Sequence, residues 1–94
     1  MFFVYFLYSA SSDIYYIGHT NNIDRRLAEH NHSDHNTFTS KHRPWVLQYY
    51  FKISNSRSDA QKIENFIKKQ KSRRLIVKII DDKLALADFS HVLK

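Results

Sequence analysis

Two closely spaced apolar stretches at the start of the chain predict a β-hairpin. Residues 2–8 are aromatic or aliphatic at every position, a pattern typical of a central strand that is buried on both faces. Residues 9–13 have the composition of a turn, and residues 14–17 predict a second, shorter strand. We expect this strand to end at Gly18, because glycine adopts backbone angles that are closed to other residues.

A first helix is predicted directly after the hairpin. Ile23, Leu27 and His30 recur at the spacing i, i+4, i+7, which places them on one face of an amphipathic helix. We expect Thr20 or Asn21 to be its N-cap, since both side chains can accept a hydrogen bond from the first turn.

One strand and two helices are predicted in the second half of the chain. Residues 31–40 are polar and predict a loop, and the strict alternation of apolar residues over 45–53, after Pro44, predicts a third strand. With Ser58 as N-cap, a second helix carries an apolar side made of Ala60, Ile63, Phe66 and Ile67. The spacing favours a third helix over 73–80, although this run also fits a strand.

The order of these elements predicts the fold class. Taken together with a last helical turn over 84–89, the order β-β-α-β-α-(α) indicates an α/β (α+β) fold with a small, three-stranded, mostly antiparallel sheet flanked by helices. A length of 94 residues corresponds to one domain, which we expect to span residues 1–94.

Composition and charge narrow the classes of function. The chain has no cysteine, which excludes disulfides and cysteine-ligated zinc. The apolar start is too short for a signal peptide or a membrane span, so we expect a soluble, cytoplasmic protein with no membrane partner. The formal net charge is +6, and the stretch 62–74 holds six basic residues and the single acid Glu64. Such clustering favours a polyanionic partner, foremost nucleic acid, and on charge alone a solvated helix face explains it about equally well.

Candidate chemistry begins with two tyrosines, an arginine and a histidine. Tyr5 and Tyr16 lie on neighbouring strands of the predicted hairpin, where core aromatic residues are the ordinary alternative. Arg26 lies at the edge of the buried stripe of the first helix, where a half-buried guanidinium calls for an anion. One turn later His30 faces inward, and a structural histidine is its ordinary alternative.

An inward carboxylate and a group of histidines are the two candidate metal sites. Glu64 lies on the apolar side of the second helix amid positive charge, so it either binds a divalent cation or pairs with Lys68 at i, i+4. The group His30, His32 and His35 has poor spacing for a zinc site, and a histidine-rich loop needs no metal.

These residues together resemble the GIY-YIG nuclease family, and within it the small single-domain bacterial members of the YhbQ-like (UPF0213) type. Phe3-Val4-Tyr5 corresponds to the first motif and Tyr16-Ile17-Gly18 to the second. Arg26 follows Gly18 at the family's spacing, and His30 and Glu64 fall in register with the family's remaining site residues. The asparagine that many family nucleases carry after the metal helix is absent from residues 72–80.

The resemblance implies a structure-specific rather than sequence-specific endonuclease of DNA repair or processing, acting on DNA that is branched or flapped. Glu64 would hold one Mg²⁺ or Mn²⁺ with no small-molecule cofactor, Arg26 would stabilise charge on the phosphate, and Tyr5, Tyr16 and His30 would surround the attacking water. Which of those three takes the proton stays open. The expected backbone-binding residues are His19, Lys41, Arg43, Lys68, Lys69, Lys71, Arg73 and Arg74. The alternative is a nucleic-acid-binding module of the same fold with little or no activity.

Overall fold

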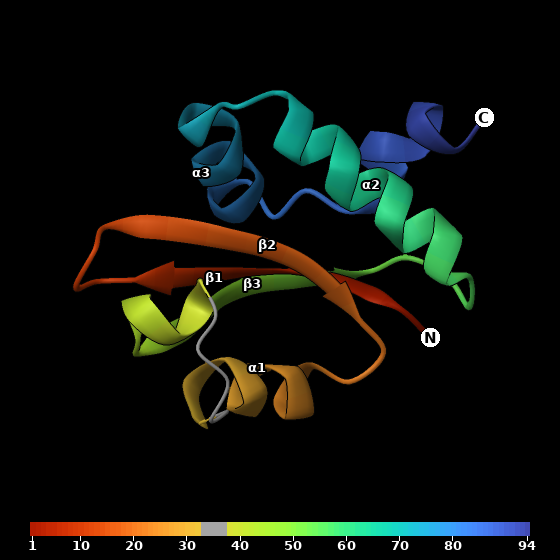
Figure 1. The fold of residues 1–94 in the computed structure, drawn as a ribbon. Coiled ribbons are helices and arrows are strands. Elements are labelled where there is room, and N and C mark those ends of the chain that lie inside the picture. The colour runs from red at the N-terminus through yellow and green to blue at the C-terminus, as the bar shows by residue number, and fades with distance from the viewer. Residues whose placement is uncertain (33–37) are drawn as a thin grey trace.

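A computed structural model describes residues 1–32 and 38–94 of the chain, and it contains a three-stranded antiparallel sheet covered on both faces (Figure 1). The strands are β1 (Phe3–Ser9), β2 (Ile14–Thr20) and β3 (Trp45–Lys52), in the order β2-β1-β3, so that β1 is central as predicted. The helices are α1 (Ile23–His32), α2 (Arg57–Lys69) and α3 (Arg73–Asp81), with the short 3₁₀ helices η1 (Thr39–His42) and η2 (Leu86–Leu93). The predicted fold class is therefore confirmed.

The central strand divides the buried side chains into two clusters. Val4 and Phe6 face α2, α3 and η2, and they pack with residues such as Ile63 and Ile79. Tyr5 and Leu7 point to the opposite face, which α1 covers, and pack against a smaller cluster that includes Trp45, Tyr16, Ile23, Leu27 and Leu47. Because successive side chains of a strand point to opposite faces, the fully apolar composition of β1 follows from its central position.

A β-bulge in β3 changes the meaning of its alternating pattern. Phe6 pairs with Tyr49 and Leu7 with Leu47, so Gln48 is an extra residue opposite β1. Trp45 and Leu47 therefore lie on the α1 side, whereas Tyr49 belongs to the core under α2 and α3. The predicted strand is confirmed, but its apolar positions serve two faces rather than one.

Gly18 lies inside β2 and does not end it. The strand continues to Thr20, Gly18 pairs with Tyr5 across the ladder, and its φ is not positive, so the prediction of a strand-ending glycine was wrong. The physical reason for glycine is space. A Cβ at this position would lie 2.6 Å from Cζ of Tyr5, well inside van der Waals contact. The missing side chain makes room for the Tyr5 ring.

Replacing Gly18 with alanine should destabilise the protein by about 1–3 kcal/mol, the usual range for overpacking a buried site. The added methyl group would push the Tyr5 ring out of its position. Urea unfolding of the two proteins would measure the difference. In the variant Gly18→Ala/Tyr5→Leu the methyl group no longer meets a phenol, so the alanine should cost much less there than in the wild-type background. An equal cost in both backgrounds would contradict this account.

The helix boundaries differ from the predicted ones by one or two residues. Asn22, rather than Thr20 or Asn21, caps α1 by accepting from the Arg25 amide at 3.0 Å. The side chain of Ser56, rather than Ser58, accepts from Asp59 N and caps α2. The third helix forms as predicted, and the predicted turn at 84–89 is the longer η2. Within the described residues, no helix has the length and apolar character needed to cross a membrane.

Candidate active site

The phenol of Tyr5 lies at the centre of a buried polar cluster between the sheet and α1. Its oxygen is 2.8 Å from Nε2 of His30, and Arg26 Nε donates to it at 3.4 Å. Tyr5 and His30 are only 2% and 3% exposed. Ile23 and Leu27 pack against the sheet and fix the face of α1 that carries Arg26 and His30 one turn apart. Three of the predicted catalytic residues are thus in direct contact.

Burial keeps both partners of the Tyr5–His30 hydrogen bond neutral. Desolvation raises the pKa of Tyr5 well above its ordinary value of 10, against the lowering effect of Arg26. Desolvation, reinforced by the charge of Arg26, lowers the pKa of His30 from 6.5 to about 4. Because Arg26 donates to the phenol oxygen, we assign the phenol O–H as the donor to His30 Nε2. The proton of the neutral imidazole then lies on Nδ1.

Arg26 is held on two sides and remains partly open to solvent. Besides its contact with Tyr5, it donates from NH1 to Glu29 Oε1 at 3.1 Å, and its side chain is 41% exposed. Burial lowers the pKa of its guanidinium, but the hydrogen bonds to Tyr5 and Glu29 prevail and raise it further above the ordinary value. The guanidinium is therefore a fixed positive charge at the mouth of the cluster.

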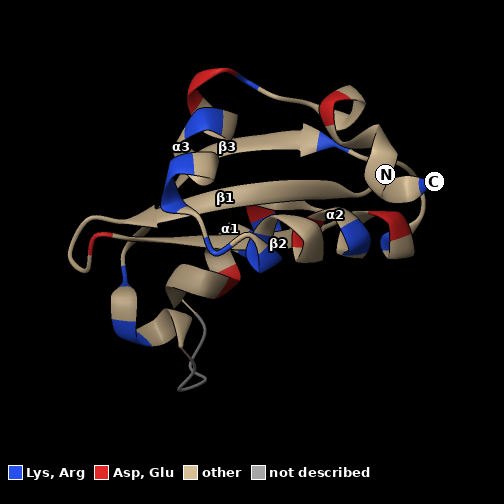
Figure 2. Cartoon of the chain, turned by 90° about the horizontal axis from the view of Figure 1, so that it is seen from above, with Lys and Arg blue, Asp and Glu red and all other residues tan. Residues whose placement is uncertain are grey.

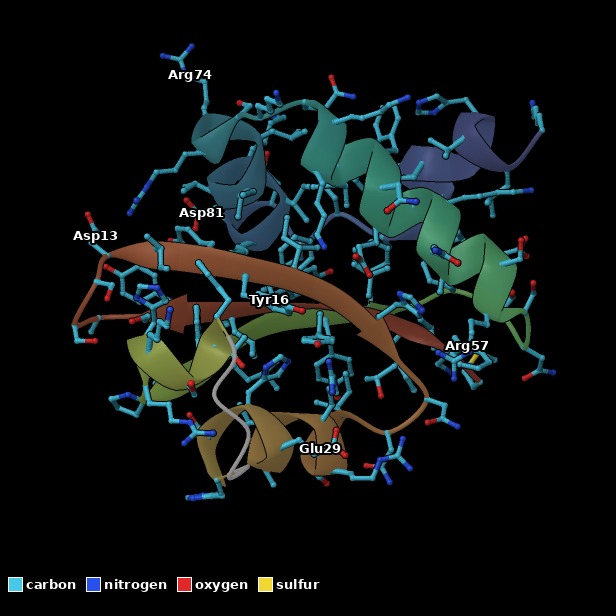
Figure 3. All side chains as sticks on the ribbon, in the orientation of Figure 1. Asp13, Tyr16, Glu29, Arg57, Arg74 and Asp81 are labelled. Carbon is cyan, nitrogen blue, oxygen red and sulfur yellow. The ribbon has the colours of Figure 1, made fainter. Side chains whose placement is uncertain are left out.

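Tyr16 joins the cluster from the edge strand β2 (Figure 3). Its ring centroid is 4.8 Å from that of His30 and 6.3 Å from that of Tyr5. On its other side Nζ of Lys68, from α2, lies 5.6 Å from the ring centroid. Tyr16 is half-buried, so it is the more accessible of the two predicted phenols.

Glu64 lies on the α2 side of the same edge strand, and both of its oxygens are engaged. Oε1 is 2.6 Å from His19 Nδ1, and Oε2 accepts from Lys68 Nζ at 2.6 Å. The side chain is 11% exposed, as expected for the inward carboxylate. Lys68 contacts both this carboxylate and the Tyr16 ring, so Glu64 and the phenol cluster meet around β2. The charge of Glu64 is among the influences that raise the pKa of Tyr5.

The donor set around Glu64 is compatible with Mg²⁺ or Mn²⁺. A single carboxylate with waters and substrate oxygens is an ordinary way to hold Mg²⁺, and in this structure Oε2 of Glu64 accepts from Lys68. Among the described residues, no group of three or more histidine, aspartate or glutamate side chains forms a preformed metal site. The alternative zinc site includes His35, which lies outside the described residues, and Nε2 of His30 is bonded to Tyr5.

The predicted backbone-binding residues are scattered over several elements and several of them have protein partners. Arg43 Nε donates to the carbonyl of His30 at 2.7 Å, and Arg73 donates to Asp13 Oδ1 at 2.7 Å. Arg74 extends from α3 away from the sheet (Figure 3), and Figure 2 shows the basic residues distributed along both α2 and α3. Of the five remaining members, His19 and Lys68 contact Glu64, and Lys41, Lys69 and Lys71 are exposed.

Two contacts of the site were not predicted from the sequence. His19, which we expect near the phosphate, also contacts Glu64 Oε1 through Nδ1 at 2.6 Å, and Arg57 donates to His19 Nε2 at 3.5 Å. The strand register would have predicted the contact of His19 with α2, because odd residues of β2 point toward α2 once the strand continues past Gly18. No local pattern in the sequence marks the contact of Arg57.

Comparisons with known proteins agree with this arrangement. The family model described as the GIY-YIG catalytic domain matches residues 1–78. A curated relative from Pediococcus acidilactici, described as the UPF0213 protein in the ldhD 5′ region, is 33% identical over 92 residues, which cover 96% of this chain and 92% of that protein. No solved structure matches the chain.

Proposed function

The chain belongs to the GIY-YIG nuclease family, and on that premise we propose that it hydrolyses phosphodiester bonds of DNA with the help of one divalent cation. The observation that carries the proposal is the convergence of the Tyr5–His30–Arg26 cluster and the Glu64 carboxylate around one edge strand. The proposed substrates are branched, flapped or single-stranded DNA, in repair or processing.

Glu64 would hold the cation, with His19 orienting the carboxylate through Nδ1. Bound there, Mg²⁺ or Mn²⁺ supplies Lewis-acid polarisation of the phosphate and stabilises the leaving oxygen. The hydrogen bond from His19 fixes the direction of Oε1, and Lys68 balances the charge of the carboxylate when no other cation is near.

Arg26 binds the phosphate and stabilises the negative charge that develops on it. Its guanidinium is partly exposed and held by Tyr5 and Glu29, so little ordering is needed when the anion arrives. The oxygen of the attacking water bonds to phosphorus as the bond from phosphorus to the leaving sugar oxygen breaks. The water gives up one proton to solvent, and the leaving sugar oxygen takes one up from solvent.

Tyr5 is a positioning residue in this proposal, and Tyr16 is the phenol that contacts substrate. The Tyr5 hydroxyl is engaged by Arg26 and His30, and its raised pKa makes it a poor base. Tyr16 is half-buried at the edge of the sheet, where its hydroxyl can orient the water. His30 holds both phenols in position, through its hydrogen bond to the Tyr5 hydroxyl and its contact with the Tyr16 ring.

One observation favours a second candidate, a binding module with little or no activity. The ammonium of Lys68 lies 2.6 Å from Oε2 of Glu64, so a metal ion must displace it before binding there. If this pair does not open, the surface would hold nucleic acid without cutting it.

Cleavage assays on single-stranded, duplex, flapped and branched DNA with Mg²⁺ or Mn²⁺ test the proposal. Arg26→Ala should reduce the rate about 10²–10³-fold, the usual effect of removing one donor to a developing charge. Arg25→Ala is a matched control, because its neighbouring guanidinium contacts Asn21 at 2.9 Å and lies outside the cluster. The proposed site would be refuted if chelation of the metal leaves cleavage intact, or if both variants cleave at the wild-type rate. Binding without cleavage by the wild type would favour the module.

A further inference from the structure

A pocket of about 340 Å³ lies next to the candidate active site, between the edge strand β2 and the helices α2 and α3. On the β2 side the pocket is lined by Tyr15, whose ring lies on the α2 and α3 face of the strand, and by the edge of Tyr16, and its floor includes Ile67 of α2 and Ile76 of α3. Its volume is near the lower end of the range of about 300–1,000 Å³ for small-molecule sites. The pocket therefore suits one flat ring system better than an extended ligand.

The rim of this pocket is positively charged. Lys68, Lys71 and Arg73 line it, and none of its lining residues is acidic. Two of these cations have acidic partners beside the pocket, since Lys68 pairs with Glu64 and Arg73 with Asp13. The guanidinium of Arg73 also lies 5.1 Å from the Tyr15 ring centroid. Aromatic and apolar walls under a cationic rim match a ligand with a flat base and a phosphate.

Lys71 supplies a second, independent observation. It follows the C-cap of α2 with a φ of 47°, in the left-handed region where helices commonly place glycine. Within the described residues no salt bridge involves its ammonium. A second hollow on the far side of α2 is lined by Lys62, Lys68, Lys69 and Lys71, so Lys68 and Lys71 border both. Lys71 therefore has a strained, left-handed backbone and borders both basic hollows.

We propose that this pocket binds one nucleotide of the substrate, with its unpaired base against Tyr15 and the apolar floor and its phosphate at Lys71 and Lys68. This inference rests on the proposed function and specifies it, because a base that enters the pocket must lie outside a duplex. The pocket and the active site share Tyr16 and Lys68, so the bound nucleotide neighbours the phosphate that is cut.

The test compares two labelled probes with the same charge, a pentathymidylate and its abasic counterpart, by fluorescence anisotropy in EDTA, so that no cleavage occurs. Stacking of one base changes affinity by about tenfold or more, so the wild type should prefer the thymidylate by that factor. Ile76→Phe, which fills the pocket from α3, should remove the preference and leave the affinity for the abasic probe unchanged.

Lys71→Gly gives a result that a purely structural role would not. Glycine relieves the left-handed backbone, so the melting temperature should stay equal or rise while both probes bind several-fold more weakly. Lys83→Gly is the matched control, because Lys83 has a φ of 52° just after the C-cap of α3 and lines neither hollow. This variant should bind both probes like the wild type.

Equal affinity of the wild type for the two probes, including no affinity for either, would overturn the pocket proposal. A preference that survives in Ile76→Phe, or unchanged binding in Lys71→Gly, would overturn it as well. Cleavage that depends on Arg26 is measured separately. If the protein cleaves DNA but shows no preference for a base, only the pocket proposal is refuted. If it prefers the base but does not cleave, only the proposed nuclease activity is refuted.

Discussion

Glu64→Gln should lower the rate of DNA cleavage by at least about 10³-fold, because the amide removes the negative charge that would hold the divalent cation. A bound metal contributes several kcal/mol of stabilisation to the transition state, and each 1.36 kcal/mol corresponds to a factor of ten. Glutamine keeps the shape of the side chain and can still bond to His19, so the fold should survive. Cleavage rates at saturating Mg²⁺ or Mn²⁺ measure the effect, and calorimetric titration with Mn²⁺ should show that binding is lost with it.

Asp82→Asn is the matched control for this change. Asp82 accepts from Lys78 at 2.9 Å four residues along the chain, as Glu64 accepts from Lys68, but it is exposed at the C-cap of α3. We expect this control to cleave at the wild-type rate. Full activity of Glu64→Gln, or Mn²⁺ binding that is the same with and without the carboxylate, would show that the cation is held elsewhere or is not needed.

Acidification should destabilise the folded protein through His30. The pKa of this imidazole is about 4 in the fold and 6.5 as its ordinary value. The unfolded chain therefore binds the proton more readily, and stability is lost as the pH falls from 6.5 toward 4. The contribution amounts to about 2.5 kcal/mol between pH 8 and pH 4.5, since each unit of pKa is worth 1.36 kcal/mol. Free energies of unfolding by urea at several pH values measure it.

The effect of His30 is separated from that of other groups by substitution. His30→Gln cannot take up the proton, so its free energy of unfolding should fall by about 2.5 kcal/mol less than that of the wild type over this pH range. His32→Gln is the control, because His32 is exposed on the same helix and should retain the wild-type pH dependence. Parallel pH profiles for the wild type and His30→Gln would contradict the burial of a neutral imidazole.

The sequence predicted the elements of this fold well because their periodicities are strong. A fully apolar β1, the alternation over β3 and the helical spacing of α2 each point to one structure. The bulge at Gln48 was not predictable. Its extra residue moves the later apolar positions of β3 to the other face of the sheet, but in the sequence the alternation of apolar and polar residues continues unbroken. The caps of α1 and α2 were misplaced because neighbouring asparagines and serines have similar capping ability.

The candidate site was predictable where its residues share one helix and less so where it depends on strand register. Arg26 and His30 are four residues apart on α1, so their common face follows from helical geometry. The bond of His19 to Glu64 depends on how far β2 continues, and the premature end assigned at Gly18 concealed it. The pocket beside Tyr16 is formed by three elements, and no local pattern describes it.

The close contact of Tyr5 with Gly18 has a consequence for how such chains can diverge. The glycine is required by the ring that lies over it, and not by its own backbone angles. A lineage that replaces the tyrosine with a small residue is then free to accept a side chain at the glycine. A lineage that changes the glycine first meets a steric barrier. The two positions lie on separate strands thirteen residues apart, and they should therefore covary, with the tyrosine changing before the glycine.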